Sequence, residues 1–266
     1  MLGAIIGDIA GSRFEHRRIK QKEFDFFHEG CRLTDDSVMT LAVADAILAC
    51  AGDFSALSAA AVRSMQTLGR RYPAAGYGWH FSDWLETDDP EPYNSFGNGA
   101  GMRVSPCAQA AKSMEDALAM SDAVTAVSHD HPEGMKGARA ITAAIFLART
   151  SADKAAIREH ILKNYYAIDF TLDEIRPTYR FDVTCQGSVP QALESFFESD
   201  SFEDAIRNAV SLGGDSDTIG AMAGSIAEAY YGIPDALREG ALGYMDVYQR
   251  NILRRFEQHY PLPARG

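Results

Sequence analysis

The stretch that decides the fold is GGDSDTIGAMAGSIAEAYYG, residues 213–232. Two glycines lead into Asp215-Ser216-Asp217-Thr218, and the Ala-rich apolar segment that follows carries no charge until Glu228. Glycines before a run of Asp, Ser and Thr are typical of a tight turn at a helix start, so the pattern predicts a buried helix. Helix capping alone could explain these polar side chains, because their oxygens accept hydrogen bonds from the first free N–H groups of the helix.

A second helix start of the same kind lies near the other end of the chain. In LTDDSVMTLAVADAILACAG, residues 33–52, a TDDS sequence precedes another apolar helix. If the two starts meet in space, four aspartates share one site: Asp35, Asp36, Asp215 and Asp217. Two like charges ~4 Å apart cost on the order of 4 kcal/mol at an effective dielectric of about 20, so protons or cations must neutralise them. Oxygen ligands select a hard divalent ion, which predicts Mg2+ or Mn2+ rather than zinc.

The composition argues against several classes of protein. The chain has 266 residues and a formal net charge of -12, which disfavours a nucleic-acid binder that works by neutralising phosphates. Its four cysteines show no CxxC or Cys/His spacing, so we expect neither zinc nor disulfides, and a reducing compartment. Asp8 interrupts the apolar start of the chain, and no apolar run reaches the length of a membrane span. We therefore expect a cytoplasmic protein without a membrane partner, and the oligomeric state stays open.

Helix starts recur along the chain, and strand-like alternation is nearly absent. Apolar residues at three- and four-residue spacing follow most of the expected starts, which are Asp53 or Ser55, Ser113, Pro132, Ser151, Ser188 with Gln191, and Ser201. Residues 3–15 carry glycines at positions 3, 7 and 11, which indicates a closely packed helix, and residues 180–189 are the one modest strand candidate. These patterns predict an all-α fold, a single compact orthogonal helical bundle over residues 1–266.

Two segments interrupt this helical pattern. Residues 70–85, RRYPAAGYGWHFSDWL, contain a proline and two glycines, which predicts an irregular connection with Trp79 and Trp84 packed into the core. In the second segment, Gly97-Asn98-Gly99 precedes a short helix, and a glycine-rich turn at a helix start presents free N–H groups that suit a diphosphate. We expect Arg103, in that helix, to form a structural salt bridge.

The two aspartate motifs together resemble the ADP-ribosylglycohydrolase family, the enzymes that remove ADP-ribose from proteins, in particular the dinitrogenase reductase-activating glycohydrolases. Four further segments are similar to the same family in the same order: GAIIGDIAGSRFE, RRYPAAGYG, SFGNGAGMRVSP and SVPQAL. The resemblance therefore covers nearly the whole chain. It implies a binuclear magnesium or manganese site at helix N-termini, with the metals bound to the ribose hydroxyls beside the bond that is cleaved.

The resemblance also implies roles for individual residues. The metal ligands would be Thr34, Asp35, Asp36, Asp215, Asp217 and Thr218. The contacts to ADP-ribose would come from Gly76, Gly78, Ser95, Phe96, Gly97, Asn98 and His129, with Phe96 stacking on the ligand. Glu15 would lie at the mouth of the site, followed by a flap, and either Asp36 or Asp217 would act as general base. We interpret Ser37 and Ser216 as capping or supporting residues.

Three functions are compatible with these motifs. The first is a metal-dependent hydrolase that releases ADP-ribose from arginine or serine side chains of a modified protein. The second is a hydrolase of another ADP-ribosyl compound, a free metabolite or a modified base. The third is a non-catalytic relative similar to a lens crystallin, which the retention of all four aspartates and both threonines disfavours. The sequence does not distinguish the arginine linkage from the serine linkage.

Overall fold

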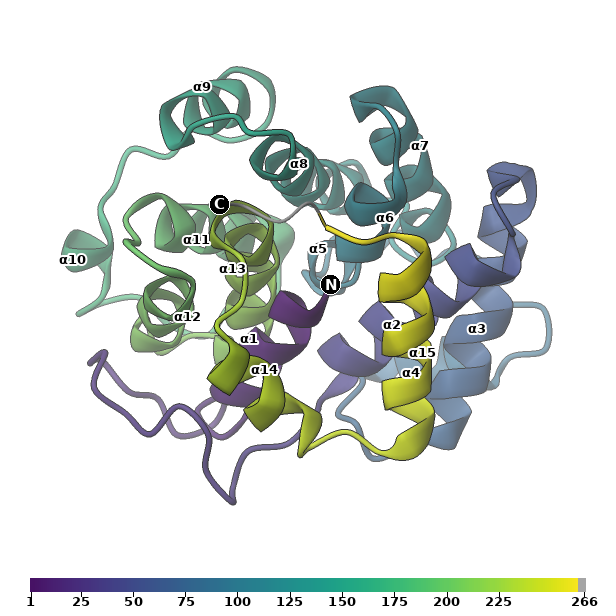
Figure 1. Cartoon of the computed structure of the whole chain (residues 1–266), viewed down its shortest axis with the longest axis horizontal. Coiled ribbons are helices and arrows are strands. Elements are labelled where there is room, and N and C mark those ends of the chain that lie inside the picture. Colours follow the sequence, from purple (N-terminus) through teal and green to yellow (C-terminus); the bar gives the residue numbers. More distant parts are fainter. Residues whose placement is uncertain (263–266) are drawn as a thin grey trace.

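The computed structural model describes residues 1–262, and this part of the chain folds into helices without a β-strand (Figure 1). The helices are α1 (Leu2–Ser12), α2 (Asp35–Ala49), the 3-10 turn η1 (Phe54–Ala56), α3 (Leu57–Arg71), α4 (Trp79–Glu86), α5 (Gly99–Met102), α6 (Ser105–Ala110), α7 (Met114–Thr125), α8 (Pro132–Arg149), α9 (Lys154–Asn164), α10 (Leu172–Ile175), α11 (Cys185–Phe197), α12 (Phe202–Ser211), α13 (Ser216–Tyr231), α14 (Asp235–Leu242) and α15 (Val247–His259). The predicted all-α, compact architecture is confirmed. Residues 263–266 of the predicted domain lie outside the described part.

The centre of the molecule is formed by α1 and α13, which run antiparallel in close contact (Figure 1). Every residue of α1 is buried, as is α13 from Ser216 to Ala229. A Cβ atom added to Gly7 would overlap the carbonyl group of Gly220, and one added to Gly11 would overlap that of Ser216. The predicted close contact is confirmed, and it holds the start of α13 beside the end of α1.

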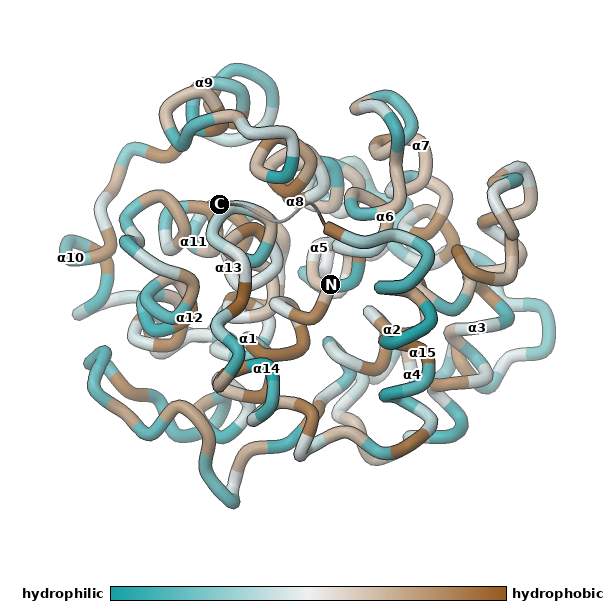
Figure 2. The backbone as a smooth tube through the Cα atoms, in the orientation of Figure 1, coloured by the Kyte–Doolittle hydropathy of each residue, from teal (hydrophilic) through white to brown (hydrophobic). Residues whose placement is uncertain are grey.

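The outer helices are polar on the side that faces solvent. Figure 2 shows hydrophilic residues along α9 and α15 and hydrophobic residues along the central α1. α15 lies against α2 and buries Ile252, Leu253 and Phe256. None of the helices in residues 1–262 combines the length and hydrophobicity that a membrane span needs.

Several predicted helix starts are confirmed by their capping contacts. Ser113 accepts a hydrogen bond from the Asp116 N–H at 3.1 Å at the start of α7. Ser201 does the same for the Asp204 N–H at 3.1 Å, and Pro132 is the first residue of α8.

Two predicted helix starts are wrong. Asp153, not Ser151, caps α9, because its carboxylate accepts from the Ala156 N–H at 2.8 Å. The expected capping box at Ser188 is not formed, because α11 begins earlier, at a cap provided by Thr184. Ser188 lies within that helix and donates its hydroxyl proton to the Thr184 carbonyl at 2.6 Å.

The two segments expected to be irregular or extended agree with the prediction only in part: the connection between α3 and α4 is irregular and Trp84 is buried, as expected. Residues 70–85 include the start of α4, where Trp84 is buried and donates its indole N–H to the Val127 carbonyl at 3.0 Å. Trp79 is wrongly predicted as a core residue, since 73% of it is exposed. In the strand candidate, residues 180–189, a single antiparallel bridge joins Gly97 to Thr184 before α11 begins.

Candidate active site

The starts of α2 and α13 meet, as the aspartate motifs predict. The Thr218 hydroxyl, in the first turn of α13, donates to Asp36 Oδ2 at 3.1 Å. Both helix starts line one cleft of about 410 Å³. A larger, more open hollow of about 790 Å³ lies at the opposite end of α13, near Tyr231 and Arg238, but the carboxylate groups described below are not there.

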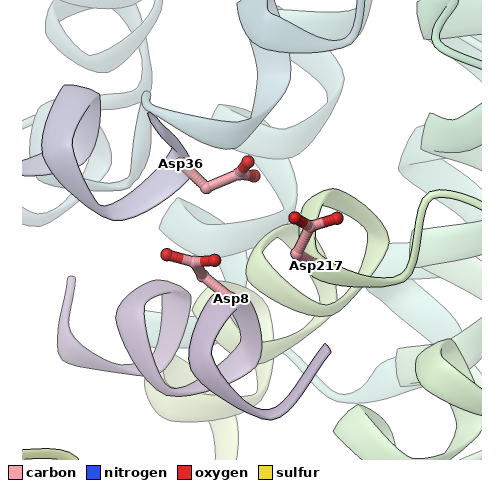
Figure 3. Close-up of side chains that lie close together, drawn as sticks. All are labelled: Asp8, Asp36 and Asp217. Atoms are coloured by element: carbon pink, nitrogen blue, oxygen red, sulfur yellow. The ribbon is translucent and has the colours of Figure 1, made fainter. Parts of the chain in front are cut away.

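The carboxylates form two groups that share Asp217. Asp8, Asp36 and Asp217 make up the first group, and Glu15, Asp215 and Asp217 make up the second. In each group, one oxygen from every carboxylate lies within 4.8 Å of the others. Figure 3 shows the first group, with Asp8 on α1, Asp36 on α2 and Asp217 on α13 directed toward a common point. Three helices from distant parts of the sequence therefore supply one acidic centre.

Asp8 is a member of this centre that the motif analysis missed. Its carboxylate accepts from the Thr34 hydroxyl at 2.7 Å, the Thr34 N–H at 2.9 Å and the Ser37 N–H at 3.1 Å. A fourth, short hydrogen bond comes from the Ser37 hydroxyl. Asp8 therefore fixes the start of α2 against α1. A lone acid in an apolar, glycine-spaced helix was the sequence signal that could have identified it.

Helix capping does not account for the aspartates. Thr34 caps α2 by accepting from the Asp36 N–H at 3.3 Å, so the carboxylate of Asp36 is not needed there. Asp215 occupies the cap position of α13, yet its carboxylate accepts from the Asn98 side-chain amide at 2.7 Å. Asp36 Oδ1 is buried and has no hydrogen-bond partner within residues 1–262. An unpaired buried carboxylate oxygen is costly, so this atom calls for a proton or a cation.

Burial raises the pKa of every aspartate in the centre, and repulsion from neighbouring carboxylates raises it further for all of them except Asp8. Burial is the largest cause, and it raises the pKa of Asp35 to about 7 and those of Asp8 and Asp215 to about 6. Burial, followed by repulsion from neighbouring aspartates, raises the pKa values of Asp36 and Asp217 well above the usual range. These shifts reflect the free-energy cost of ionising the carboxylates in this buried centre, and a bound divalent cation would offset that cost. The buried oxygen donors and the unpaired Asp36 Oδ1 fit a hard cation.

The rest of the cleft is lined by most of the residues assigned to ADP-ribose. Its wall includes Gly76, Gly78, Ser95, Gly97, Asn98 and His129. Asn98 links this wall to the acidic centre through its hydrogen bond to Asp215. Phe96, predicted to stack on the ligand, lies outside the lining, where its ring is 5.2 Å from that of His131. The Gly97–Thr184 bridge fixes the backbone here, and 43% of Phe96 is exposed.

Arg103 supports His129 and does not form the expected salt bridge. It is fully buried without a carboxylate partner in the described part of the chain, and its Nη2 donates to the Ser128 hydroxyl at 2.7 Å. The same nitrogen lies 3.4 Å from His129 Nδ1. Burial lowers the pKa of Arg103 to about 10, and burial together with repulsion from Arg103 lowers the pKa of His129 well below its usual value. His129 is therefore neutral, with its Nδ1 side held by Ser128 and Arg103.

The cleft also contains aromatic and apolar residues that the motifs did not indicate. They are Trp79, His80, Phe81, Tyr93, Phe181 and Val183. The rings of Trp79 and His80 lie 4.7 Å apart, and those of Tyr93 and His129 lie 5.8 Å apart. No spacing in the sequence connects residues 79–93 with residues 181–183, because tertiary packing alone brings them together.

A family model described as ADP-ribosylglycohydrolase matches residues 1–261. The chain belongs to the ADP-ribosylglycohydrolase family. A solved structure titled "ADP-ribosylglycohydrolase-related protein complex" has the same fold, with a TM-score of 0.73 and 22% identity over 98% of this chain and 95% of that one. The resemblance inferred from the aspartate motifs is thus confirmed.

The chain matches different fractions of the length of three relatives in this family. The chain is 28% identical to the ADP-ribosylarginine hydrolase Tri1 of Serratia proteamaculans (strain 568), over 58% of this chain and 43% of that protein. It is 26% identical to the Tri1 of Pseudomonas putida (strain GB-1), over 88% of this chain and 70% of that protein. Human ADP-ribosylhydrolase ARH3 is 26% identical over 62% of this chain and 59% of its own length. The chain therefore spans less than two thirds of two of these three relatives.

Proposed function

We propose that this protein hydrolyses the bond between ADP-ribose and a protein side chain. The buried group of Asp8, Asp36 and Asp217 carries this proposal, because it is a buried cluster of carboxylates, suited to a divalent cation, at the wall of a cleft. Family membership supports it, and so do the names of two relatives, an ADP-ribosylarginine hydrolase and an ADP-ribosylhydrolase.

The acidic centre would hold two divalent cations, Mg2+ or Mn2+. The proposed ligands are Thr34, Asp35, Asp36, Asp215, Asp217 and Thr218. When bound, such cations orient the sugar hydroxyls, stabilise developing charge and lower the pKa of a bound water. Asp8, which is saturated by donors from Thr34 and Ser37, would hold the first of these ligands in place rather than bind an ion itself.

The protein's own residues would perform the remaining steps. Water attacks the anomeric carbon of the distal ribose, the bond to the acceptor side chain breaks, and the acceptor leaves with a proton. Asp36 or Asp217 would take the proton of the attacking water and pass it on to the acceptor side chain that leaves. Glu15, half-buried beside Asp215 and Asp217, would stand where the acceptor leaves the cleft.

On the other side of the cleft, neutral His129 and the Gly97–Gly99 turn would bind the nucleotide part of the substrate. The pKa of His129 lies well below its usual value, so this imidazole binds and orients without supplying a positive charge. Asn98 would connect the nucleotide-binding side of the cleft with the acidic centre, because it lines the cleft and its side-chain amide donates to Asp215 at 2.7 Å.

An assay of ADP-ribose release tests this proposal. Peptides carrying ADP-ribose on arginine or on serine are offered with Mg2+, with Mn2+ and with a chelator. We expect release from at least one linkage with a cation, none with the chelator, and loss of release in Asp36→Asn. If neither peptide releases ADP-ribose under any condition, protein de-ADP-ribosylation is rejected, and hydrolysis of a free ADP-ribosyl compound is the function to test next.

A further inference from the structure

Two short segments at the mouth of the cleft concentrate positive charge in an acidic protein. Residues 16–20, HRRIK, and residues 176–180, RPTYR, together contain five Lys or Arg residues and no Asp or Glu. The whole chain has 25 basic against 37 acidic residues, so these segments oppose its overall charge. We call this cluster the basic lip, and it consists of Arg17, Arg18, Lys20, Arg176 and Arg180.

The two segments are held together by Lys20. Its ammonium group donates to the Tyr179 carbonyl at 2.7 Å and, through a short hydrogen bond, to the Leu212 carbonyl. Partial burial lowers the pKa of Lys20, and repulsion from the nearby Arg18, Arg180 and Arg176 lowers it further. In Figure 1 the loop after α1 and the segment after α10 lie on the same side of the molecule.

The basic lip adjoins the acidic centre. Glu15, directly before the first segment, and Phe181, directly after the second, both line the cleft. A Cβ atom added to Gly213 would lie 2.6 Å from the Ile19 carbonyl oxygen, so the first segment packs on the turn that leads into Asp215. The lip therefore extends outward from the end of the cleft where the acidic centre lies.

Most charges of the lip have no counter-charge in the described part of the chain. Arg17, Arg18 and Arg180 are exposed and form no ion pair within residues 1–262. Arg176 pairs with Asp173. Two further acids lie beside the lip. Asp182 accepts from the Thr184 N–H and hydroxyl at 2.8 and 2.7 Å, and Glu15 lies 3.7 Å from His16 and forms no ion pair with an arginine of the lip. Like charges grouped without partners repel one another, and an external anion relieves that repulsion.

We propose that the basic lip binds an acidic segment of the substrate protein that flanks its ADP-ribosylated side chain. This inference rests on the proposed function. The bond to be cleaved would lie at the acidic centre, so the acceptor chain would leave the cleft beside Glu15, where the lip begins. The lip would thus select acceptor proteins by charge, while the cleft itself recognises ADP-ribose.

Kinetics on matched peptides test the proposal. Peptides with the same ADP-ribose linkage and either Asp/Glu or Ser/Gly flanking residues are compared at 50 and 300 mM NaCl. Each exposed ion pair contributes roughly 1.4- to 5-fold in affinity, so we expect the acidic peptide to have a kcat/KM about tenfold higher at low salt. The variant Arg17→Glu/Arg18→Glu/Arg180→Glu should lose this preference through KM, with unchanged kcat on the neutral peptide.

The matched control reverses three exposed arginines elsewhere, Arg63→Glu/Arg254→Glu/Arg255→Glu, and changes the net charge equally. It should keep the preference for the acidic peptide. Equal kcat/KM for acidic and neutral peptides in the wild-type protein at low salt overturns the proposal without variants, even if the triple variant fails to fold. Release from neither peptide would instead contradict the proposed function.

Two further measurements distinguish an acidic protein segment from other ligands that the basic lip could bind. If the lip variant weakens binding of free ADP-ribose as much as it weakens the acidic peptide, the lip acts on the nucleotide and the proposal is wrong. If a single-stranded oligonucleotide competes with the acidic peptide at lower concentration than an unmodified acidic peptide does, the lip is a nucleic-acid surface and the proposal is again overturned.

Discussion

Replacing Asp217 by asparagine should stabilise the cation-free protein and abolish its response to divalent cations. Asp217 belongs to both carboxylate groups, with neighbouring carboxylate oxygens within 4.8 Å. Two ionised carboxylates at that distance repel by roughly 3.5 kcal/mol at an effective dielectric of about 20. Partial protonation already relieves some of this repulsion in the wild-type protein, so we expect a net gain of about 2–3 kcal/mol at pH 7.5. The asparagine oxygen can still accept from the Thr218 N–H.

The pH dependence of this gain has a defined sign. Folding raises the pKa values of the clustered aspartates, so the folded wild-type protein binds more protons than the unfolded chain between pH 4 and about 7. Its stability therefore falls as the pH rises through this range, and the advantage of Asp217→Asn grows with it. At pH 4.5, where the aspartates are protonated, the two proteins should be nearly equal.

Urea unfolding with a chelator, at pH 7.5 and at pH 4.5, measures this difference. The control is Asp45→Asn, an aspartate on α2 outside the carboxylate groups, which should show no pH-dependent gain. Adding Mn2+ at pH 7.5 should then stabilise the wild-type protein and leave Asp217→Asn unchanged. If Asp217→Asn is less stable than wild type at pH 7.5 in chelator, or responds to Mn2+ as wild type does, the reasoning is refuted.

Three more predictions follow from the same geometry. Cation affinity, measured by calorimetry, should fall steeply as the pH drops from 7.5 to 5.5, because bound ions compete with protons on Asp35 and Asp215. A cation affinity that does not change with pH would exclude these two carboxylates as ligands. Gly7→Ala should lower the free energy of unfolding by about 3 kcal/mol or more, because the added methyl group overlaps Gly220. In the control Gly30→Ala the added methyl group lies 3.4 Å from its nearest neighbour, so the free energy of unfolding should change by less than about 1 kcal/mol. Similar losses for the two variants in urea unfolding would contradict the α1–α13 contact. Arg103→Met should raise the pKa of His129 and weaken ADP-ribose binding, which NMR titration and calorimetry can follow; an unchanged pKa would show that Arg103 does not act on this imidazole.

The sequence predicted the central helices because their signals are local. Glycines at positions 3, 7 and 11 and the TDDS and GGDSDT starts each specify a short piece of backbone, and the structure agrees with all three. Ser151 and Ser188 were misjudged because several nearby side chains could cap those helices. In the structure, Asp153 caps α9 and Thr184 caps α11.

The acidic centre was predicted in part for the same reason. Asp35, Asp36, Asp215 and Asp217 stand at helix starts, where a motif is visible. Asp8 lies within a helix and contributes because α1 packs against α13 and because Thr34 and Ser37 at the start of α2 donate hydrogen bonds to it. The exposure of Trp79 and the burial of Arg103, which has no carboxylate partner within residues 1–262, likewise depend on neighbours that are remote in sequence.

The most direct measurement of the central claim is an anomalous difference map from crystals soaked in Mn2+. The account predicts two peaks between the starts of α2 and α13, in contact with oxygens of Asp36 and Asp217, and no peaks there in crystals of Asp217→Asn. A map without density at this centre, or with Mn2+ bound only at acidic residues elsewhere on the surface, would contradict it.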